Sequence, residues 1–175
     1  VATARKNITD NLAPTKALLK SWGLNYVIGK TIGLDNHQLA GTDQERANDF
    51  QEMMDNPNIK AIWCVRGGYG TVKMLDYLDF SNFIKNPKWI IGFSDVTVLH
   101  SQLNTFQVAS IHAIMPINVS TASWEAKNSL QKALFGESIA YEEKFNPKNK
   151  LGNAKGTLVG GNLSILYSLM GSQTQ

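Results

Sequence analysis

The sequence has one cysteine, Cys64, among its 175 residues. A single thiol cannot form an internal disulfide, and a zinc site built from several cysteines is excluded. Cys64 lies in the apolar run 61–65, which predicts a buried core thiol and fits a reducing compartment. No stretch approaches the roughly 20 apolar residues of a membrane helix. No signal peptide is visible, although the chain does not begin with Met, so a removed signal stays open.

The excess of basic over acidic residues is also small. The chain has 17 basic and 14 acidic residues, for a formal net charge of +3. Asn, Pro and Gly interrupt its one loose basic cluster, which predicts a solvated connection and no nucleic-acid partner; the cluster comprises Lys144, Lys148, Lys150 and Lys155. The 43% hydrophobic and 18% charged content is typical of a globular domain with a sizeable core.

Short apolar runs alternate with longer amphipathic ones. Helices are predicted over 9–22, 43–54, 71–78, 95–103 and 124–135, and strands over 25–28, 60–65, 88–93 and 108–114. Strand–helix alternation with short connections implies parallel strands. Strands that are apolar on successive residues imply a sheet covered on both faces. We therefore predict an open, mostly parallel α/β sheet with helices on both faces, in the flavodoxin or Rossmann-like layering, with its site at the carboxyl ends of the strands.

The pattern changes after residue 140. The segment 141–156 is polar, with Pro147 and Gly152, and predicts a linker. An apolar run and one helix, predicted over 162–170, follow it. We predict an α/β domain over 1–140, a linker over 141–156 and the start of a second domain over 157–175.

One glycine-rich turn, residues 66–70 (RGGYG), joins a predicted strand to a predicted helix. Glycines permit positive φ and a close approach of the backbone to a ligand. Free N–H groups at a helix start favour an anion or a developing oxyanion. The alternative is a tight turn that uses glycine for geometry alone. No Lys-Ser/Thr follows in the spacing of a phosphate-binding P-loop.

A second turn, residues 92–95 (GFSD), places Ser94 between a strand and a helix. A nucleophile elbow has this position, where a sharp turn projects a hydroxyl above the sheet edge. The N–H of Asp95 would point at an oxyanion formed beside Ser94. The competing interpretation is that Ser94 only caps the helix, because serine is a common N-cap.

A serine nucleophile needs a base, and the chain has three histidines. His37 is predicted in an exposed loop. His100 lies more than one helical turn from Ser94 and is a poor base. His112 ends a predicted strand and could reach the site edge, but a structural histidine is an equal alternative. No triad can be closed from these residues.

Five segments together resemble the LD-carboxypeptidases, serine peptidases that include the muramoyl-tetrapeptide carboxypeptidases and the microcin-immunity peptidases. The resemblance covers nearly the whole chain, and the order of the segments is specific. They are 40–51 (AGTDQERANDFQ), 59–70 (IKAIWCVRGGYG), 75–79 (LDYLD), 92–97 (GFSDVT) and 156–164 (GTLVGGNLS). Residues 112–115 read HAIM where the family has H-G-P-M, and residues 1–3 look like the tail of its first strand.

The resemblance implies a Ser-Glu-His triad with Ser94 as nucleophile and the amides of Gly67, Gly68 and Asp95 as the oxyanion hole. It suggests Arg66, Tyr69 and Asn162 as substrate-binding residues, with no metal and no cofactor. The implied reaction releases a terminal D-Ala from the tetrapeptide of recycled murein. The implied protein is cytoplasmic and a homodimer. The Glu and His are expected beyond Gln175, so this chain alone is expected to be inactive.

Three alternatives stay open. The first is a microcin-type hydrolase of the same family that acts on a peptide–nucleotide conjugate. The second is a non-catalytic α/β domain that binds a peptide or a phosphate-bearing ligand, the latter at the Gly67–Gly70 turn. The third is a purely structural or interaction domain. Two glycine-bearing turns at adjacent strand ends favour a site over the third alternative.

Overall fold

A three-stranded parallel sheet lies at the centre of the computed structural model, which describes residues 1–7 and 12–174. Its order is β1 (Ala61–Trp63), β2 (Trp89–Gly92) and β3 (Ile111–His112). Ile62 pairs with Ile90, and Gly92 pairs with His112. Parallel pairing places the three carboxyl ends at one edge, where the second predicted turn leaves β2.

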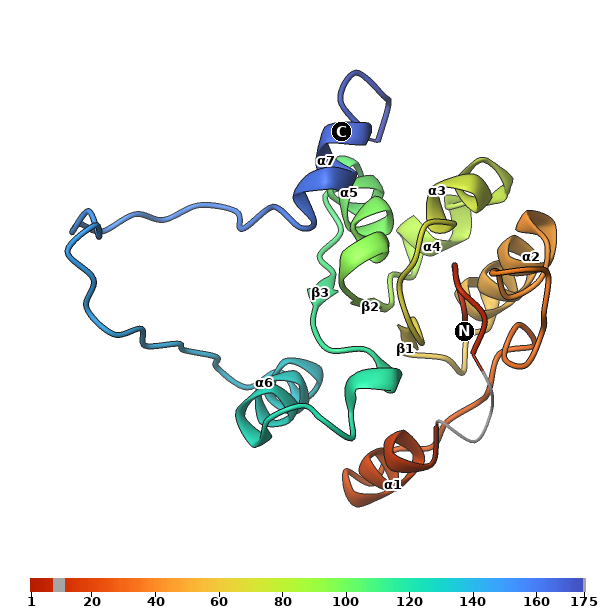
Figure 1. Ribbon diagram of the computed structural model, residues 1–175, viewed down its shortest axis with the longest axis horizontal. Coiled ribbons are helices and arrows are strands. Elements are labelled where there is room, and N and C mark those ends of the chain that lie inside the picture. The colour runs from red at the N-terminus through yellow and green to blue at the C-terminus, as the bar shows by residue number, and fades with distance from the viewer. Residues whose placement is uncertain (8–11, 175) are drawn as a thin grey trace.

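Helices cover both faces of this sheet, which confirms the predicted architecture (Figure 1). On one face lie α1 and α6, and on the other lie α2 to α5 and α7. The α-helices are α1 (Ala13–Ser21), α2 (Asp43–Asp55), α3 (Thr71–Met74), α4 (Ser81–Lys85), α5 (Thr97–Thr105), α6 (Trp124–Phe135) and α7 (Leu163–Ser168); the 3-10 helices are η2 (Leu75–Tyr77), η3 (Ser94–Val96) and η4 (Pro116–Asn118). In the part of the chain that is described, no helix is both long enough and apolar enough to span a membrane.

The main core fills the space between the sheet and the second group of helices. Phe50 of α2, Phe83 of α4, Ile90 of β2 and Leu99 of α5 are all fully buried in one cluster. Their burial explains the periodicity of three and four that marks the helices in the sequence. Each of these helices therefore packs one apolar face on the sheet. This packing fixes the positions of the turns that join the strands to the helices at the sheet edge.

Helix ends follow the local sequence closely. Thr42 caps α2 in a reciprocal box, in which its side chain accepts from the N–H of Glu45 and the Glu45 carboxylate accepts from the N–H of Thr42. Pro14 lies in the first turn of α1, and Gly23 follows that helix with a φ of 72°. The start predicted for this helix at about residue 9 lies outside the described residues.

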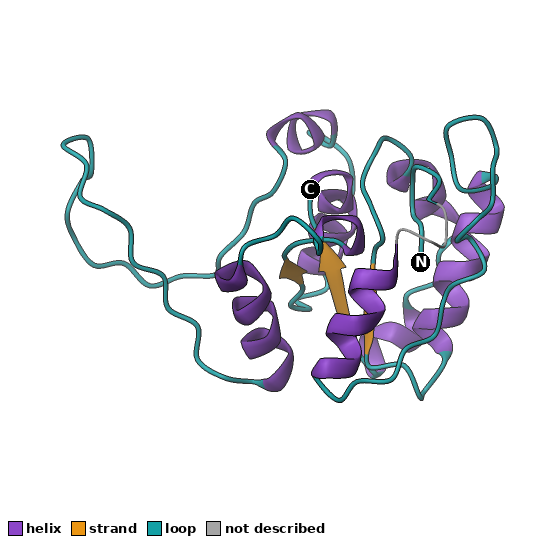
Figure 2. Ribbon diagram, turned by 60° about the horizontal axis from the view of Figure 1, so that its bottom comes forward, coloured by secondary structure: helices purple, strands orange, loops and turns teal. Residues whose placement is uncertain are grey.

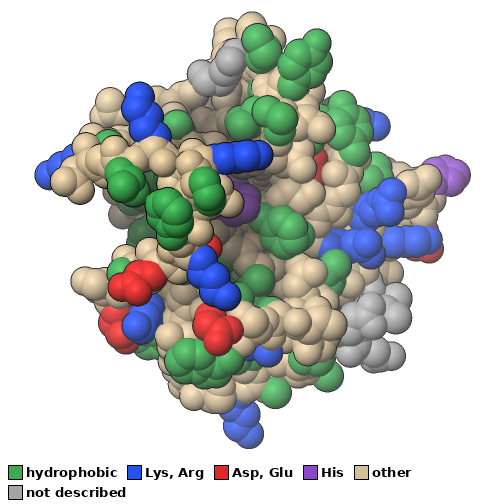
Figure 3. Space-filling view, turned by 60° about the vertical axis from the view of Figure 1, so that its left-hand side comes forward, with side chains coloured by type: hydrophobic (Ala, Val, Ile, Leu, Met, Phe, Trp, Pro, Cys, Tyr) green, Lys and Arg blue, Asp and Glu red, His purple; other side chains and the backbone are tan. Residues whose placement is uncertain are grey.

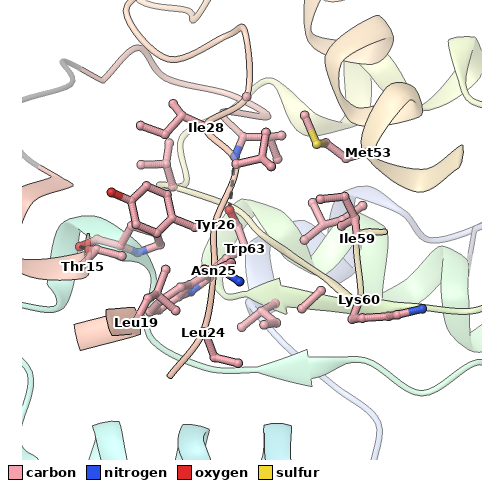
Figure 4. A pocket seen from close by; sticks show the side chains of 18 of the residues that line it. Thr15, Leu19, Leu24, Asn25, Tyr26, Ile28, Met53, Ile59, Lys60 and Trp63 are labelled. Carbon is pink, nitrogen blue, oxygen red and sulfur yellow. Dashed lines mark hydrogen bonds between the residues drawn. The ribbon is translucent and has the colours of Figure 1, made fainter. Parts of the chain in front are cut away.

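The strand predicted at 25–28 is wrong, because this segment is extended but pairs with no other backbone among the described residues. It faces a cavity of about 350 Å³ that separates it from β1 (Figure 4). At the end of that cavity the Val1 amine donates to the Trp63 carbonyl, and the Val65 N–H donates to Val1. Residues 1–3 therefore run beside the carboxyl end of β1, at one end of this cavity.

Other elements differ from the prediction in length. The strand predicted over 108–114 is only Ile111–His112, and the helix predicted over 71–78 divides into α3 and η2. The helix predicted over 95–103 begins as η3 before α5 continues it, while α4 and η4 were not predicted. Apolar alternation marks these segments correctly, but hydrogen bonding to neighbours decides where regular structure stops.

An exposed arm, residues 137–161, leaves the body after α6 and returns to it (Figure 2). It has no helix or strand. The chain then forms α7, which packs on α5 through Ile165 and Leu169. The polar linker predicted over 141–156 lies within this arm, whereas the division into two domains stays a prediction.

Candidate active site

Ser94 stands at the carboxyl end of β2 in a strained backbone conformation. Its φ is 59°, in the left-handed region that costs a non-glycine residue about 1 kcal/mol. The Ser94 side chain caps neither η3 nor α5, and in the described structure its hydroxyl has no hydrogen-bond partner. The interpretation of Ser94 as a simple helix cap is therefore not supported. A sharp turn that presents an unengaged hydroxyl is the geometry of a nucleophile elbow.

The glycine-rich turn lies directly against this hydroxyl. A β-carbon built on Gly67 would lie 3.2 Å from the Oγ of Ser94 and 3.5 Å from the backbone nitrogen of Asp95. Across residues 1–7 and 12–174, the N–H groups of Gly67, Gly68 and Asp95 donate no hydrogen bond. The structure thus places Gly67 against Ser94 and Asp95, whereas a β-carbon on Gly68 would meet Arg5 and Ala4. The use of all three N–H groups as an oxyanion hole stays a prediction.

The side chain of Asp95 ties the two turns together. Its fully buried carboxylate accepts from the N–H of Gly70 at 3.2 Å, the N–H of Thr71 at 2.9 Å and the hydroxyl of Thr71 at 2.7 Å. All three bonds use one oxygen, Oδ2, and Oδ1 is buried without a partner in the described structure. From the sequence only the backbone N–H of Asp95 is predicted to take part in the site, and the role of its side chain is not predicted.

The three predicted substrate-binding residues differ in their surroundings. Tyr69 is 61% exposed on the turn. Arg66 donates from Nη1 to the carbonyl of Lys6 at 3.2 Å, so part of its guanidinium holds the N-terminal residues. Asn162 caps α7 through its side chain, and its N–H donates to the Oγ1 of Thr97 at 2.9 Å. Their binding role stays a prediction.

None of the three histidines donates to or accepts from Ser94 in the described structure. His100 is buried, with its Nε2 3.0 Å from the carbonyl of Gly92 and its Nδ1 2.7 Å from the hydroxyl of Ser110. Burial lowers the pKa of His100, which favours the neutral ring. His112 is exposed, with its ring 5.8 Å from that of His100. His37 is exposed in its loop, as predicted.

The remaining chemistry is limited. Cys64 is fully buried, and burial raises the pKa of its thiol to about 12, which confirms the predicted core thiol. Within the described residues, no group of three or more His, Cys, Asp or Glu side chains is placed to hold a metal ion. The cavity beside β1 has a mostly apolar lining that does not include Ser94 or Gly67, so it is separate from this site. Figure 3 shows another hollow in the surface, with a histidine inside and lysine or arginine side chains beside it.

Comparison with known proteins points to one family. Residues 1–113 match the family model of the LD-carboxypeptidase N-terminal domain. A probable murein peptide carboxypeptidase of Bacillus subtilis is 36% identical over 162 residues, covering 88% of this chain and 50% of the relative. The microcin C7 self-immunity protein of Escherichia coli is 29% identical over 187 residues, covering 89% of this chain and 54% of that protein.

A solved structure extends the likeness to three dimensions. The muramoyltetrapeptide carboxypeptidase of Oxalobacter formigenes is 26% identical and superimposes with a TM-score of 0.84, covering 100% of this chain and 60% of that one. The chain thus spans about half to three fifths of the length of these relatives.

Proposed function

Since the chain belongs to the LD-carboxypeptidase family, we propose that the protein carrying it is a serine carboxypeptidase that uses Ser94 as its nucleophile. The observation that supports this most is the strained turn at Ser94, whose free hydroxyl lies against Gly67. The proposed substrate is a murein-derived tetrapeptide. The proposed product is its terminal D-Ala, released by hydrolysis of the bond between the L-centre of a diamino acid and D-Ala.

In the proposed first step, the Oγ of Ser94 attacks the scissile carbonyl carbon. The carbonyl oxygen gains negative charge and accepts hydrogen bonds from the N–H groups of Gly67, Gly68 and Asp95. The hydroxyl proton passes through a base to the amine of D-Ala, which leaves, and an acyl-enzyme ester remains on Ser94. Water then hydrolyses this ester and restores the hydroxyl.

The base is assigned to a Glu and a His that we expect beyond Gln175. His100 is unsuitable, because both of its ring nitrogens already contact Gly92 and Ser110. The chain alone is therefore proposed to be inactive. A substrate-contacting role is proposed for Arg66, Tyr69 and Asn162, of which Tyr69 and Asn162 are exposed.

The proposal extends to the whole protein. We propose a cytoplasmic homodimer that needs no metal, with an N-terminal domain over 1–140, a linker over 141–156 and a second domain that begins at 157. The exposure of the arm supports the linker. Ile165 and Leu169 contact the main core, and α7 lies beside α5.

The test is the release of free D-Ala from L-Ala-D-Glu-diaminopimelate-D-Ala by the complete protein and by its Ser94→Ala variant. We expect release by the parent and a loss of at least about 10³-fold in the variant. Equal release by both proteins would exclude Ser94 as the nucleophile.

A second substrate class deserves the same assay, because the microcin C7 self-immunity protein is also similar to this chain. Hydrolysis of a peptide–nucleotide conjugate without release of D-Ala would favour the microcin-type function. Binding of either ligand without turnover, unchanged by Ser94→Ala, would favour a non-catalytic domain.

A further inference from the structure

We infer that Arg46 and Asp95 are positioning residues that hold Gly70 from two sides and thereby fix the turn 66–70 against Ser94. The inference rests on the proposed function, because it assigns the two side chains to the alignment of the oxyanion donors. It also gives a role to the conspicuous segment 40–51, whose arginine the proposed mechanism does not otherwise use.

We call this pair of contacts on Gly70, one from Asp95 and one from Arg46, the clamp. Its first contact comes from Asp95, the residue next to the nucleophile. Asp95 follows Ser94 in the chain, and its carboxylate accepts from the N–H groups of Gly70 and Thr71. Hydrogen bonds to a carboxylate are stronger than those between neutral groups. The position of Gly70 is thus set relative to Ser94 by the residue next to it. The Thr71 hydroxyl adds a third bond to the same oxygen at 2.7 Å.

The Arg46 side of the clamp comes from α2. The Arg46 side chain is fully buried, and its Nη2 donates to the carbonyl of Gly70 at 3.3 Å. Nη1 donates to the carbonyl of Gly41 at 3.4 Å, and Nη2 also forms an ion pair with Asp43. A buried guanidinium is costly unless acceptors pair with it, and these contacts pair Nη1 and Nη2 and so fix the end of the Arg46 side chain beside Gly70, while Nε is buried without a partner in the described structure.

The other walls of the turn leave it little freedom. A β-carbon on Gly70 would lie 3.1 Å from the Cα of Ala4, and one on Gly68 would lie 2.6 Å from the Cγ of Arg5. The N-terminal residues therefore close the side of the turn away from the site. Both peptide groups of Gly70 are bonded to buried charged side chains, one to a carboxylate and one to a guanidinium. The turn also meets Ser94, whose Oγ would lie 3.2 Å from a β-carbon on Gly67.

Such a clamp matters for catalysis because oxyanion donors act only at the right distance. A misplacement of about 1 Å can reduce turnover about 100-fold. Loosening Gly70 would move the N–H groups of Gly67 and Gly68 relative to Ser94. Substrate binding in the ground state depends less on these donors, so the effect should fall on kcat rather than on KM.

The test uses Arg46→Lys and Asp95→Asn in the complete protein, with kcat expressed per serine titrated by a fluorophosphonate. We expect kcat to fall about 10- to 100-fold, with KM within about twofold of the parent. The matched controls are Asn48→Ala on the exposed side of α2 and Asp76→Asn on the surface, both of which should keep the parental kcat. Unchanged kcat per titrated serine in both variants would overturn the inference.

A second measurement separates this inference from the proposed function. Amide hydrogen exchange at Gly70 and Thr71 should accelerate at least about tenfold in Asp95→Asn and not in Asp76→Asn, whether or not the parent releases D-Ala. Parental protection of these amides in Asp95→Asn would contradict the clamp even in an active enzyme. An inactive parent with the expected exchange would refute the proposed function and leave the clamp standing. Should Arg46→Lys not fold, Asp95→Asn decides.

Discussion

Gly67 lies so close to Ser94 that a β-carbon on the glycine would stand 3.2 Å from both the Cβ and the Oγ of the serine. Few real contacts of a β-carbon are this short, so any side chain at position 67 must push against the nucleophile or move the turn. Ser94 also has a positive φ of 59°, so a shift of its backbone starts from a strained conformation.

Gly67→Ala should therefore lower kcat of the complete protein about 10- to 100-fold, because the methyl group displaces Ser94 or the oxyanion donors. Gly156→Ala is the control, since no heavy atom lies within 4 Å of its β-carbon and its φ is unstrained. Parental turnover in Gly67→Ala would show that the two turns do not act together.

The positive φ of Ser94 predicts a difference in stability between two inactive variants. Ser94→Gly should be more stable than Ser94→Ala by about 1 kcal/mol, because glycine adopts this conformation without the penalty of a β-carbon. Urea denaturation of the two variants measures the difference, and both should lack turnover. Equal urea midpoints would mean that the backbone at 94 relaxes in solution.

A substitution at Gly161, where the arm rejoins the body of the protein, should weaken the packing of α7 on α5. Its φ is 155°, and a β-carbon there would lie 2.5 Å from two side-chain atoms of Thr97. Gly161→Ala should detach α7 from α5 and expose Ile165 and Leu169, seen as faster amide exchange over 163–169. Gly160→Ala is a matched control, because its φ of 141° carries similar strain but its β-carbon meets no atom within 4 Å. Equal exchange in both variants would assign the effect to backbone strain.

His100 predicts a loss of stability in mild acid. Burial lowers the pKa of His100 below its ordinary value of about 6.5, so the unfolded chain binds a proton that the folded chain does not. The free energy of unfolding should therefore fall as the pH drops through about 6.5. In His100→Gln, which keeps a donor for the Gly92 carbonyl, this slope should be smaller. His37→Gln changes an exposed histidine and should keep the parental slope.

The rate at which the Cys64 thiol reacts should report unfolding of the protein. Burial raises its pKa to about 12 and shields it from reagents, so folded protein at pH 8 should react with a disulfide reagent only through unfolding. In concentrated urea one thiol per chain should react at once. Rapid labelling without denaturant would indicate an opening of the core beside β1.

The sequence predicts the layered fold because the alternation of apolar runs survives in β1, β2 and the helices around them. It fails at 25–28, where an apolar and extended segment has no strand to pair with. It also overestimates β3, because Val108 to Ser110 carry the right residue types but do not pair with β2. Apolar residue types indicate that a segment is buried. Whether the segment forms a strand depends on a hydrogen-bonded neighbouring strand, which the local sequence does not reveal.

Part of the candidate site can likewise be predicted from the sequence, and part of it cannot. The proximity of Gly67 and Ser94 is predictable, because both residues lie in turns that follow neighbouring parallel strands. The bond from Gly70 to Asp95 joins residues 25 positions apart, and an aspartate at a helix start predicts only a favourable dipole interaction. The A-G-x-D-x-x-R pattern around Arg46 was the one available signal for the second half of the clamp, since an arginine on the buried face of α2 needs partners.

The arm over residues 137–161 has a consequence for how α7 reaches α5. Because the arm is exposed and irregular, it acts as a tether whose length sets the effective concentration of α7 at its docking position, on the order of millimolar for a flexible linker. Doubling the length of such a tether costs only about 0.6 kcal/mol. Insertions in the arm can thus tune how often α7 occupies its place beside α5, without altering any residue that makes the contact.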